Sequence, residues 1–312
     1  MKKLQFLSFV LSVFVGGSAL GQEFYLRAGL GYAFPLAGQA MYDNQLSPTG
    51  YNGSRTLNTN GSQSYNIKNA SFSSGLQSVI GLGYMFTENI GVQLDAGIGL
   101  SNTKYTFNDN NEPLNVNGST IPYDISTIQQ AKTPIFLMPS LVLQTNKEKV
   151  NLYMRMGFAL PLNTKVTQDQ VYTNAPGTGA LSIDDFTWQI KSSFSLGFTA
   201  AAGVKYKISD RVSVWGELSL LAMSANTKEQ DITSWVENGQ TVPSTYQYYP
   251  QNIKYSKTAT VDSSLTLLPT YSQPFSNLGF NFGITFTLSH HESARRGSDD
   301  LIDDGKPFRR RN

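Results

Sequence analysis

Apolar and polar residues alternate with a period of two along much of the chain. In the segment 24–34, Leu26 and Leu30 share one face with aromatic residues, whereas Arg27 and Gly29 occupy the other. This period is typical of β-strands that have one face in apolar surroundings. Eight segments show it: 24–34, 76–86, 90–100, 134–145, 150–160, 194–206, 212–220 and 279–288. The fourth is the weakest, because Pro134 and Pro139 interrupt it.

The connections between these segments alternate in length. Three are tight, at 87–89, 146–149 and 209–211, and four are long, at about 37–71, 108–128, 167–185 and 231–273. Bacterial outer-membrane barrels join their strands by short periplasmic turns and long extracellular loops. A soluble lipocalin-like barrel or sandwich is the alternative, but its outward faces carry Lys and Glu, whereas charges are scarce here. We therefore predict an all-β fold, an eight-stranded antiparallel transmembrane up-and-down barrel. Ten strands are an alternative, because Tyr65, Ile67 and Tyr255 indicate hairpins within the long connections.

The two ends of the chain differ from the middle. Lys2 and Lys3 precede an apolar run, and Ala19 and Gly21 supply the small residues of a cleavage site, which predicts a signal peptide at 1–21. The barrel is expected at 22–288. The tail at 289–312 is highly charged with few apolar residues, so we expect it to be disordered and periplasmic.

Short motifs in the barrel segments resemble a known family. Gly-Leu-Gly-Tyr occurs at 29–32 and 81–84, within strand-turn-strand units. The last segment carries Asn281, Gly283, Phe286 and Leu288, a spacing similar to the β-signal that the barrel-assembly machinery reads. From about residue 23 to 288 the chain resembles the small outer-membrane β-barrels of the OmpA, OmpX and OmpW type, especially their Bacteroidetes-like members. The family barrels often end at the β-signal, whereas a charged tail follows here.

Candidate catalytic and metal-binding groups are few. The chain has no cysteine, and its two histidines, His290 and His291, follow the last strand segment. Outer-membrane hydrolases use a histidine near the outer rim, so we expect no enzyme. His290–His291, the Asp184–Asp185 pair, and Asp109 with Glu112 are better explained as solvated positions than as metal sites. We expect neither a metal nor a cofactor. Without Lys2 and Lys3, 22 basic residues balance 22 acidic ones, which gives no electrostatic reason to expect nucleic acid.

Five charged residues fall on the inward face under the alternation. They are Arg27, Asp95, Arg155, Lys205 and Glu217. An unpaired charge inside a narrow barrel costs several kcal/mol. We therefore predict that the two carboxylates pair with the cations in a network that plugs the lumen, and that Trp215 and Tyr25 fill the space beside it.

These features predict an integral protein of the cell outer membrane, exported by a cleaved signal peptide, with a structural or surface-interaction role. A narrow channel for small solutes and an adhesin that acts through its extracellular loops are the alternatives. The expected partners are outer-membrane lipid, lipopolysaccharide and the barrel-assembly machinery. A contact between the charged tail and the cell wall is a further hypothesis.

Overall fold

The computed structural model describes residues 23–36, 54–57, 62–66, 69–116, 119–174, 184–243, 251–258 and 266–288. For 54–57, 63–66, 111–116, 119–123 and 174, only the backbone is described. The expected signal peptide, the expected tail, His290 and His291 all lie outside these ranges. Within them, no helix is long and apolar enough to cross a membrane.

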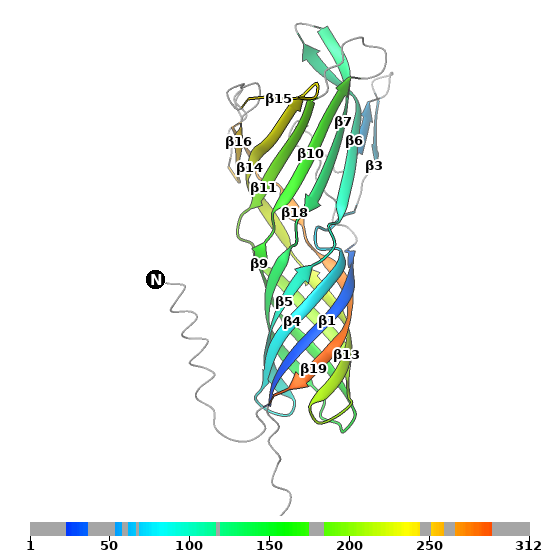
Figure 1. Ribbon diagram of the computed structural model, residues 1–312, viewed down its shortest axis with the longest axis vertical. Coiled ribbons are helices and arrows are strands. Elements are labelled where there is room, and N and C mark those ends of the chain that lie inside the picture. The colour runs from blue at the N-terminus through cyan, green and yellow to red at the C-terminus, as the bar shows by residue number, and fades with distance from the viewer. Residues whose placement is uncertain are drawn as a thin grey trace, which may run out of the picture.

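Eight strands close into a barrel, as predicted (Figure 1). Each strand pairs with its two neighbours in the antiparallel sense, in the ring order β1-β19-β13-β12-β9-β8-β5-β4. Their bounds are β1 Glu23–Pro35, β4 Gly75–Met85, β5 Ile90–Gly99, β8 Ile135–Gln144, β9 Val150–Asn163, β12 Gly197–Lys207, β13 Val212–Ala222 and β19 Asn277–Thr287. Strands that follow one another within this set are neighbours, so the topology is up-and-down.

The short connections lie at one end of the barrel, here called the turn end. Residues 86–89 join β4 to β5, 145–149 join β8 to β9, and 208–211 join β12 to β13, which confirms the three predicted tight turns. The interruption expected in the fourth segment is local. The ladder between β8 and β9 passes from Leu137↔Leu160 to Ser140↔Gly157 and omits Pro139, which has no N–H to donate.

The long connections build a second sheet above the other end, here called the sheet end (Figure 1). Its order is β17-β16-β14-β11-β10-β7-β6-β2-β3, with β15 and β18 also paired to β14. The bounds are β2 Ser54–Leu57, β3 Gln63–Asn66, β6 Lys104–Val116, β7 Ser119–Ala131, β10 Val166–Asn174, β11 Asp184–Ser192, β14 Ser224–Glu237, β15 Gln240–Thr241, β16 Asn252–Ser256, β17 Leu267–Pro269 and β18 Ser272–Pro274. The connections are therefore an extended sheet rather than loops with occasional hairpins. The added strands do not enter the barrel, which rules out the ten-stranded alternative.

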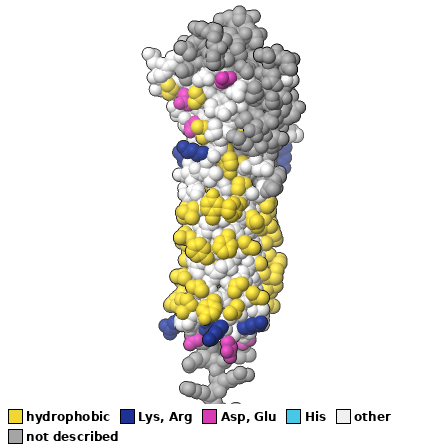
Figure 2. Space-filling view, turned by 90° about the vertical axis from the view of Figure 1, so that its right-hand side faces the viewer, with side chains coloured by type: hydrophobic (Ala, Val, Ile, Leu, Met, Phe, Trp, Pro, Cys, Tyr) yellow, Lys and Arg dark blue, Asp and Glu magenta, His cyan; other side chains and the backbone are white. Residues whose placement is uncertain are grey.

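The alternation predicted for the barrel strands is confirmed. Outward residues such as Ile80 and Phe282 are each 57% exposed, whereas inward Glu217 is 2% exposed. Figure 2 shows the outward apolar side chains as a band across the face of the barrel that it draws, with charged side chains at the turn end and basic ones above the band. A soluble barrel has the opposite polarity, because its apolar side chains fill the interior.

Candidate functional site: the closed lumen and the sheet above it

Four charged side chains meet in the middle of the lumen. Arg27 on β1, Asp95 on β5, Arg155 on β9 and Glu217 on β13 have side chains that are 0–3% exposed. Glu217 accepts hydrogen bonds from Arg27 Nη2 at 3.1 Å and from Arg155 Nη2 at 2.7 Å. Arg155 Nη1 lies 3.2 Å from Asp95 Oδ2. Two cations face two anions, so the cluster is neutral as a whole and each strand contributes one charge.

Neutral polar side chains add further hydrogen bonds to the two carboxylates. Tyr153 Oη donates to Glu217 at 2.9 Å and Asn281 Nδ2 donates to it at 3.2 Å. Gln93 Nε2 donates to Asp95 at 2.6 Å, and Gln93 Oε1 accepts from Tyr25 Oη at 2.8 Å. The sequence placed these residues on the inward face but did not show that they join the charges. Their bonds replace the water that buried carboxylates lose.

The glycines of the Gly-Leu-Gly-Tyr motifs make room for this cluster. A Cβ at Gly29 would lie 2.5 Å from the ring of Trp215, and that ring in turn lies 3.8 Å from the Arg27 guanidinium carbon. A Cβ at Gly83 would overlap the ring of Tyr25. Packing therefore explains the glycines of this motif. The large side chains of Trp215 and Tyr25 leave no room for a Cβ at the inward positions beside them.

Lys205 does not join the cluster, although the sequence analysis included it. Its side chain faces the lumen, where Nζ donates to Gln144 Oε1 at 2.9 Å and lies 5.8 Å from the ring of Tyr25. The register explains the difference. Glu217 is opposite Gly203, and Lys205 lies one inward position closer to the turn end. The turn end of the lumen thus has its own polar contacts below the charge cluster.

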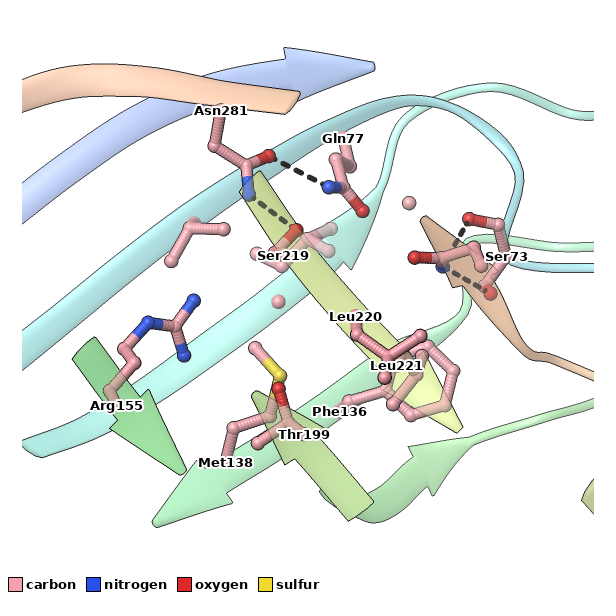
Figure 3. A pocket seen from close by; sticks show the side chains of 15 residues that line it. Ser73, Gln77, Phe136, Met138, Arg155, Thr199, Ser219, Leu220, Leu221 and Asn281 are labelled. Carbon is pink, nitrogen blue, oxygen red and sulfur yellow. Dashed lines mark hydrogen bonds between the residues drawn. The ribbon is translucent and has the colours of Figure 1, made fainter. Parts of the chain in front are cut away.

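A small cavity lies on the sheet side of the cluster (Figure 3). Its volume is about 40 Å³, and Arg155 reaches its wall. Asn281 bridges two of its polar side chains, because it accepts from Gln77 Nε2 at 2.7 Å and donates to Ser219 Oγ at 2.9 Å. A cavity needs about 10–15 Å³ to hold one water molecule. This space therefore fits a few waters and is too small for a solute of metabolite size.

An apolar cluster, here called the mouth cluster, fills the sheet end of the lumen above the cavity. Phe275 is fully buried, and its ring centroid lies 5.7 Å from Phe72 and 5.9 Å from Phe136. The cluster is extended by Ala70, Phe107, Ala131, Met138, Ala159, Val166, Ile190, Leu221, Met223 and Ala225. These residues come from the barrel, from the base of the upper sheet and from the segment 70–74. Side chains therefore fill the lumen at two levels, which we call the ionic seal and the apolar seal.

Hydrogen bonds hold the segment 70–74 in the mouth. Tyr105 Oη donates to Ser71 O at 3.0 Å and accepts from Ser71 N at 3.0 Å. Asn277 Nδ2 donates to Ser73 Oγ at 2.7 Å, and Phe72 N donates to Pro274 O at 2.9 Å. Nothing in the periodicity of the sequence marked this segment as part of the interior.

The upper sheet has a second core on its inner face. Phe186 lies 5.1 Å from Trp235, 5.6 Å from Tyr172 and 6.1 Å from Trp188, measured between ring centroids. Ile253 and Leu268 complete this buried cluster. The sheet therefore has packing of its own above the mouth, which gives it a defined shape.

The outer face of the upper sheet carries an ion-pair cluster. Lys191 Nζ donates to Asp231 at 2.6 Å and to Glu229 at 3.3 Å, and these hydrogen bonds raise the pKa of Lys191. Asn252 Nδ2 also donates to both carboxylates. Hydrogen bonds from Asn252 and Lys191 lower the pKa of Glu229. Burial raises the pKa of Asp231, but hydrogen bonds from Lys191 and Asn252 outweigh it, so this pKa also lies below its ordinary value.

No metal site is apparent in the described part of the chain. Its His, Cys, Asp and Glu residues form no group of three that could hold an ion. Asp184 and Asp185 begin β11, and Asp109 and Glu112 lie within β6. The expectation that the protein is not an enzyme remains a prediction.

The architecture defines a class. From Phe24 to Phe34 the outward residues of β1 cover about 34 Å of strand, or about 25 Å along the axis at the tilt of about 40° usual in barrels, which matches the apolar band of membrane barrels. A closed antiparallel barrel with an apolar outside and a polar inside is the architecture of transmembrane β-barrels.

Comparisons with known proteins give two similar solved structures. No protein-family model and no curated protein matches the chain. The crystal structure of the outer membrane protein OprG from Pseudomonas aeruginosa is similar at 12% identity and a TM-score of 0.38, covering 86% of this chain and 97% of that one. The solution structure of the E. coli outer membrane protein W is similar at 16% identity and a TM-score of 0.33, covering 86% and 99%. Both TM-scores lie below 0.5, so neither similarity bears on the function.

Proposed function

We propose that the chain is an integral outer-membrane β-barrel with a closed lumen, whose role is structural or lies in the surface that the upper sheet presents. The apolar band supports the membrane location, and the motifs at 29–32 and 81–84 support the resemblance to the small outer-membrane barrels. The observation that carries the closed lumen is the pair of seals. The Arg27–Glu217–Arg155 contacts fill the middle, and the mouth cluster fills the sheet end.

The asymmetry of the connections supports one orientation. In outer-membrane barrels the short turns face the periplasm and the long connections face the outside. The upper sheet would then stand on the cell surface, and the tail after Leu288 would lie in the periplasm. An adhesin is one form of the surface role, and the packed aromatic core would give such a surface a fixed shape.

Single-channel recording separates this function from that of a narrow channel. The refolded protein, inserted in a planar bilayer, should pass no steady current, because both seals must open before ions can cross. Large steady currents from the wild-type protein would establish the channel instead. In cells, the protein should fractionate with the outer membrane and should migrate faster on gels before boiling, because a closed barrel leaves no edge from which to unravel. Recovery from the soluble periplasm would contradict the membrane location.

Labelling of introduced cysteines tests the orientation. The natural chain has no cysteine, so a single substitution gives a single reactive site. A membrane-impermeant maleimide should label Lys254→Cys, at the exposed position of β16, in intact cells. It should label Asn146→Cys, in the turn between β8 and β9, only after the outer membrane is permeabilised. The reverse pattern would place the upper sheet in the periplasm.

The barrel-assembly machinery is the proposed partner of the last strand. Phe286, on the outer face of β19, and Leu288, just after this strand, are 44% and 57% exposed next to the turn end, where a second protein has access to them. Asn281 points the other way, into the lumen, and Gly283 lies against the ring of Trp215. Outward Phe286 and Leu288 are therefore the positions at which the proposed signal is open to recognition. Cell-wall contact through the tail remains a hypothesis on residues outside the described ranges.

A further inference from the structure

Three lysines lie at the lower ends of neighbouring strands, at the base of the upper sheet. Lys104 begins β6, Lys132 follows β7, and Lys165 precedes β10. All three are exposed. Their neighbours in sequence, Ala131 and Val166, are buried in the mouth cluster, so the alternation directs the lysines outward. Lys104 pairs in register with Gln130, two residues from Lys132, and Lys132 N donates to Lys165 O at 3.3 Å. We call these three residues the lysine row.

The lysine row lies at the upper border of the apolar band. Leu100 and Leu162 precede Lys104 and Lys165 by four and three residues, and they are 47% and 65% exposed. Figure 2 shows basic side chains at this border, where the apolar surface ends. Hydrocarbon and headgroup layers of a membrane meet at such a border. The row and the two leucines thus form a surface with a cationic upper part and an apolar lower part.

The described residues supply no counter-charge to the lysine row. Within the described residues, no carboxylate lies at ion-pair distance from Lys104, Lys132 or Lys165. Lys191, on the adjacent strand β11, does have two carboxylate partners. Adjacent strands are only about 4.8 Å apart, and like charges on neighbouring strands repel. An anion supplied from outside would relieve this repulsion.

We propose that the lysine row binds the phosphate groups of the phosphorylated glycolipid in the outer leaflet, while Leu100 and Leu162 contact its acyl chains. This inference rests on the proposed membrane location and orientation. Lysine ammonium groups bind phosphate as point charges. The row lies at the end of the apolar band, so the site favours an amphiphile. A free phosphate has no apolar group that could contact the leucines.

Native mass spectrometry of the full mature barrel in detergent micelles tests the site. Bis-phosphorylated lipid A is the probe, and its dephosphorylated form and inorganic phosphate are the comparison ligands. The variant Lys104→Gln/Lys132→Gln/Lys165→Gln removes the row. The control Lys228→Gln/Lys254→Gln/Lys257→Gln removes the same charge from exposed positions on β14, on β16 and just after β16. Each lysine near an anionic headgroup strengthens binding about five-fold, so the row variant should bind lipid A roughly 100-fold more weakly.

The expected result is retained lipid A in the wild type and the control, and loss of it both in the row variant and with dephosphorylated lipid. Equal binding by the row variant and the wild type would overturn the proposal, as would equal binding of dephosphorylated lipid A. Displacement of the lipid by equimolar inorganic phosphate would show a simple anion site and would also overturn it. These measurements are made in micelles and do not depend on orientation. A barrel that binds lipid A but shows the reverse cysteine labelling would retain the site and lose the proposed orientation.

Discussion

Replacement of Glu217 by Gln tests the ionic seal. Glu217 accepts from Arg27 at 3.1 Å, from Arg155 at 2.7 Å and from Tyr153 at 2.9 Å, and its side chain is fully buried. The substitution leaves one carboxylate, Asp95, between two guanidinium groups, so the neutral cluster gains one positive charge. Removal of one partner from a buried ion pair costs roughly 3–5 kcal/mol. We expect a loss of this size in the free energy of unfolding.

Urea unfolding in detergent micelles, followed by tryptophan fluorescence, measures this loss. Trp215 reports on the cluster directly, because the Arg27 guanidinium carbon lies 3.8 Å from its ring. Glu88→Gln is the matched control, since Glu88 lies in an exposed turn and accepts from Asn146. It should change the free energy by less than about 1 kcal/mol. The Glu217→Gln barrel should still pass no steady current in a planar bilayer, because the mouth cluster remains. A free energy of unfolding equal to that of the control would refute the account of the seal.

Three further predictions concern the room that Gly83 leaves for Tyr25, the apolar seal and the upper sheet. Gly83→Ala should destabilise the barrel by about 1–3 kcal/mol by crowding Tyr25, whereas Gly216→Ala, whose Cβ would meet its nearest neighbour at 4.0 Å, should be neutral in the same urea titration. Phe275→Ala should cost roughly 3–5 kcal/mol yet pass no current in a planar bilayer, because the ionic seal remains; a steady current would contradict two independent seals. The Lys191 cluster stabilises the upper sheet fully at neutral pH. The pKa values of Glu229 and Asp231 are lowered in the folded protein, so this stability is lost as the pH falls below about 4, the ordinary carboxyl pKa. The pKa of Lys191 is raised, so the stability is also lost as the pH rises above about 10.4, the ordinary lysine pKa. Thermal melting followed by near-ultraviolet circular dichroism should show both falls in the wild type, and Lys191→Met should flatten them; an unchanged profile would rule the cluster out as their cause.

The barrel could be predicted from the sequence because the alternation of apolar and polar residues lies within each single strand. Each outward residue, such as Ile80 or Phe282, meets an apolar phase, so a period of two appears within every strand. The alternation also gives the face on which a charge lies. It does not give the height along the barrel axis, which depends on register, and this is why Lys205 was grouped with charges that it does not contact.

The mouth cluster and the upper sheet could not be derived in the same way. In the upper sheet, Gln129 and Gln168 are buried and bonded to each other at 2.8 Å, so polar residues occupy the inner face as well as the outer one. This removes the contrast on which periodicity depends. Phe72 enters the interior through an irregular segment, whose position is set by contacts with residues more than 30 positions away. Such contacts leave no pattern in a single sequence.

The pairing of β1 with β19 has a consequence for how the barrel forms. These strands are the first and last of the barrel, so the ring closes only after nearly the whole chain has been delivered to the membrane. Arg27 lies on one side of this seam and Asn281 on the other, and both bond to Glu217, 190 positions after Arg27. Before closure, the buried charges lack their full set of partners and favour a hydrated, open sheet. The ion cluster thus couples chain completion to insertion: a chain that stops before β19 keeps two unpaired edges and an incompletely partnered Glu217, and the membrane interior disfavours both.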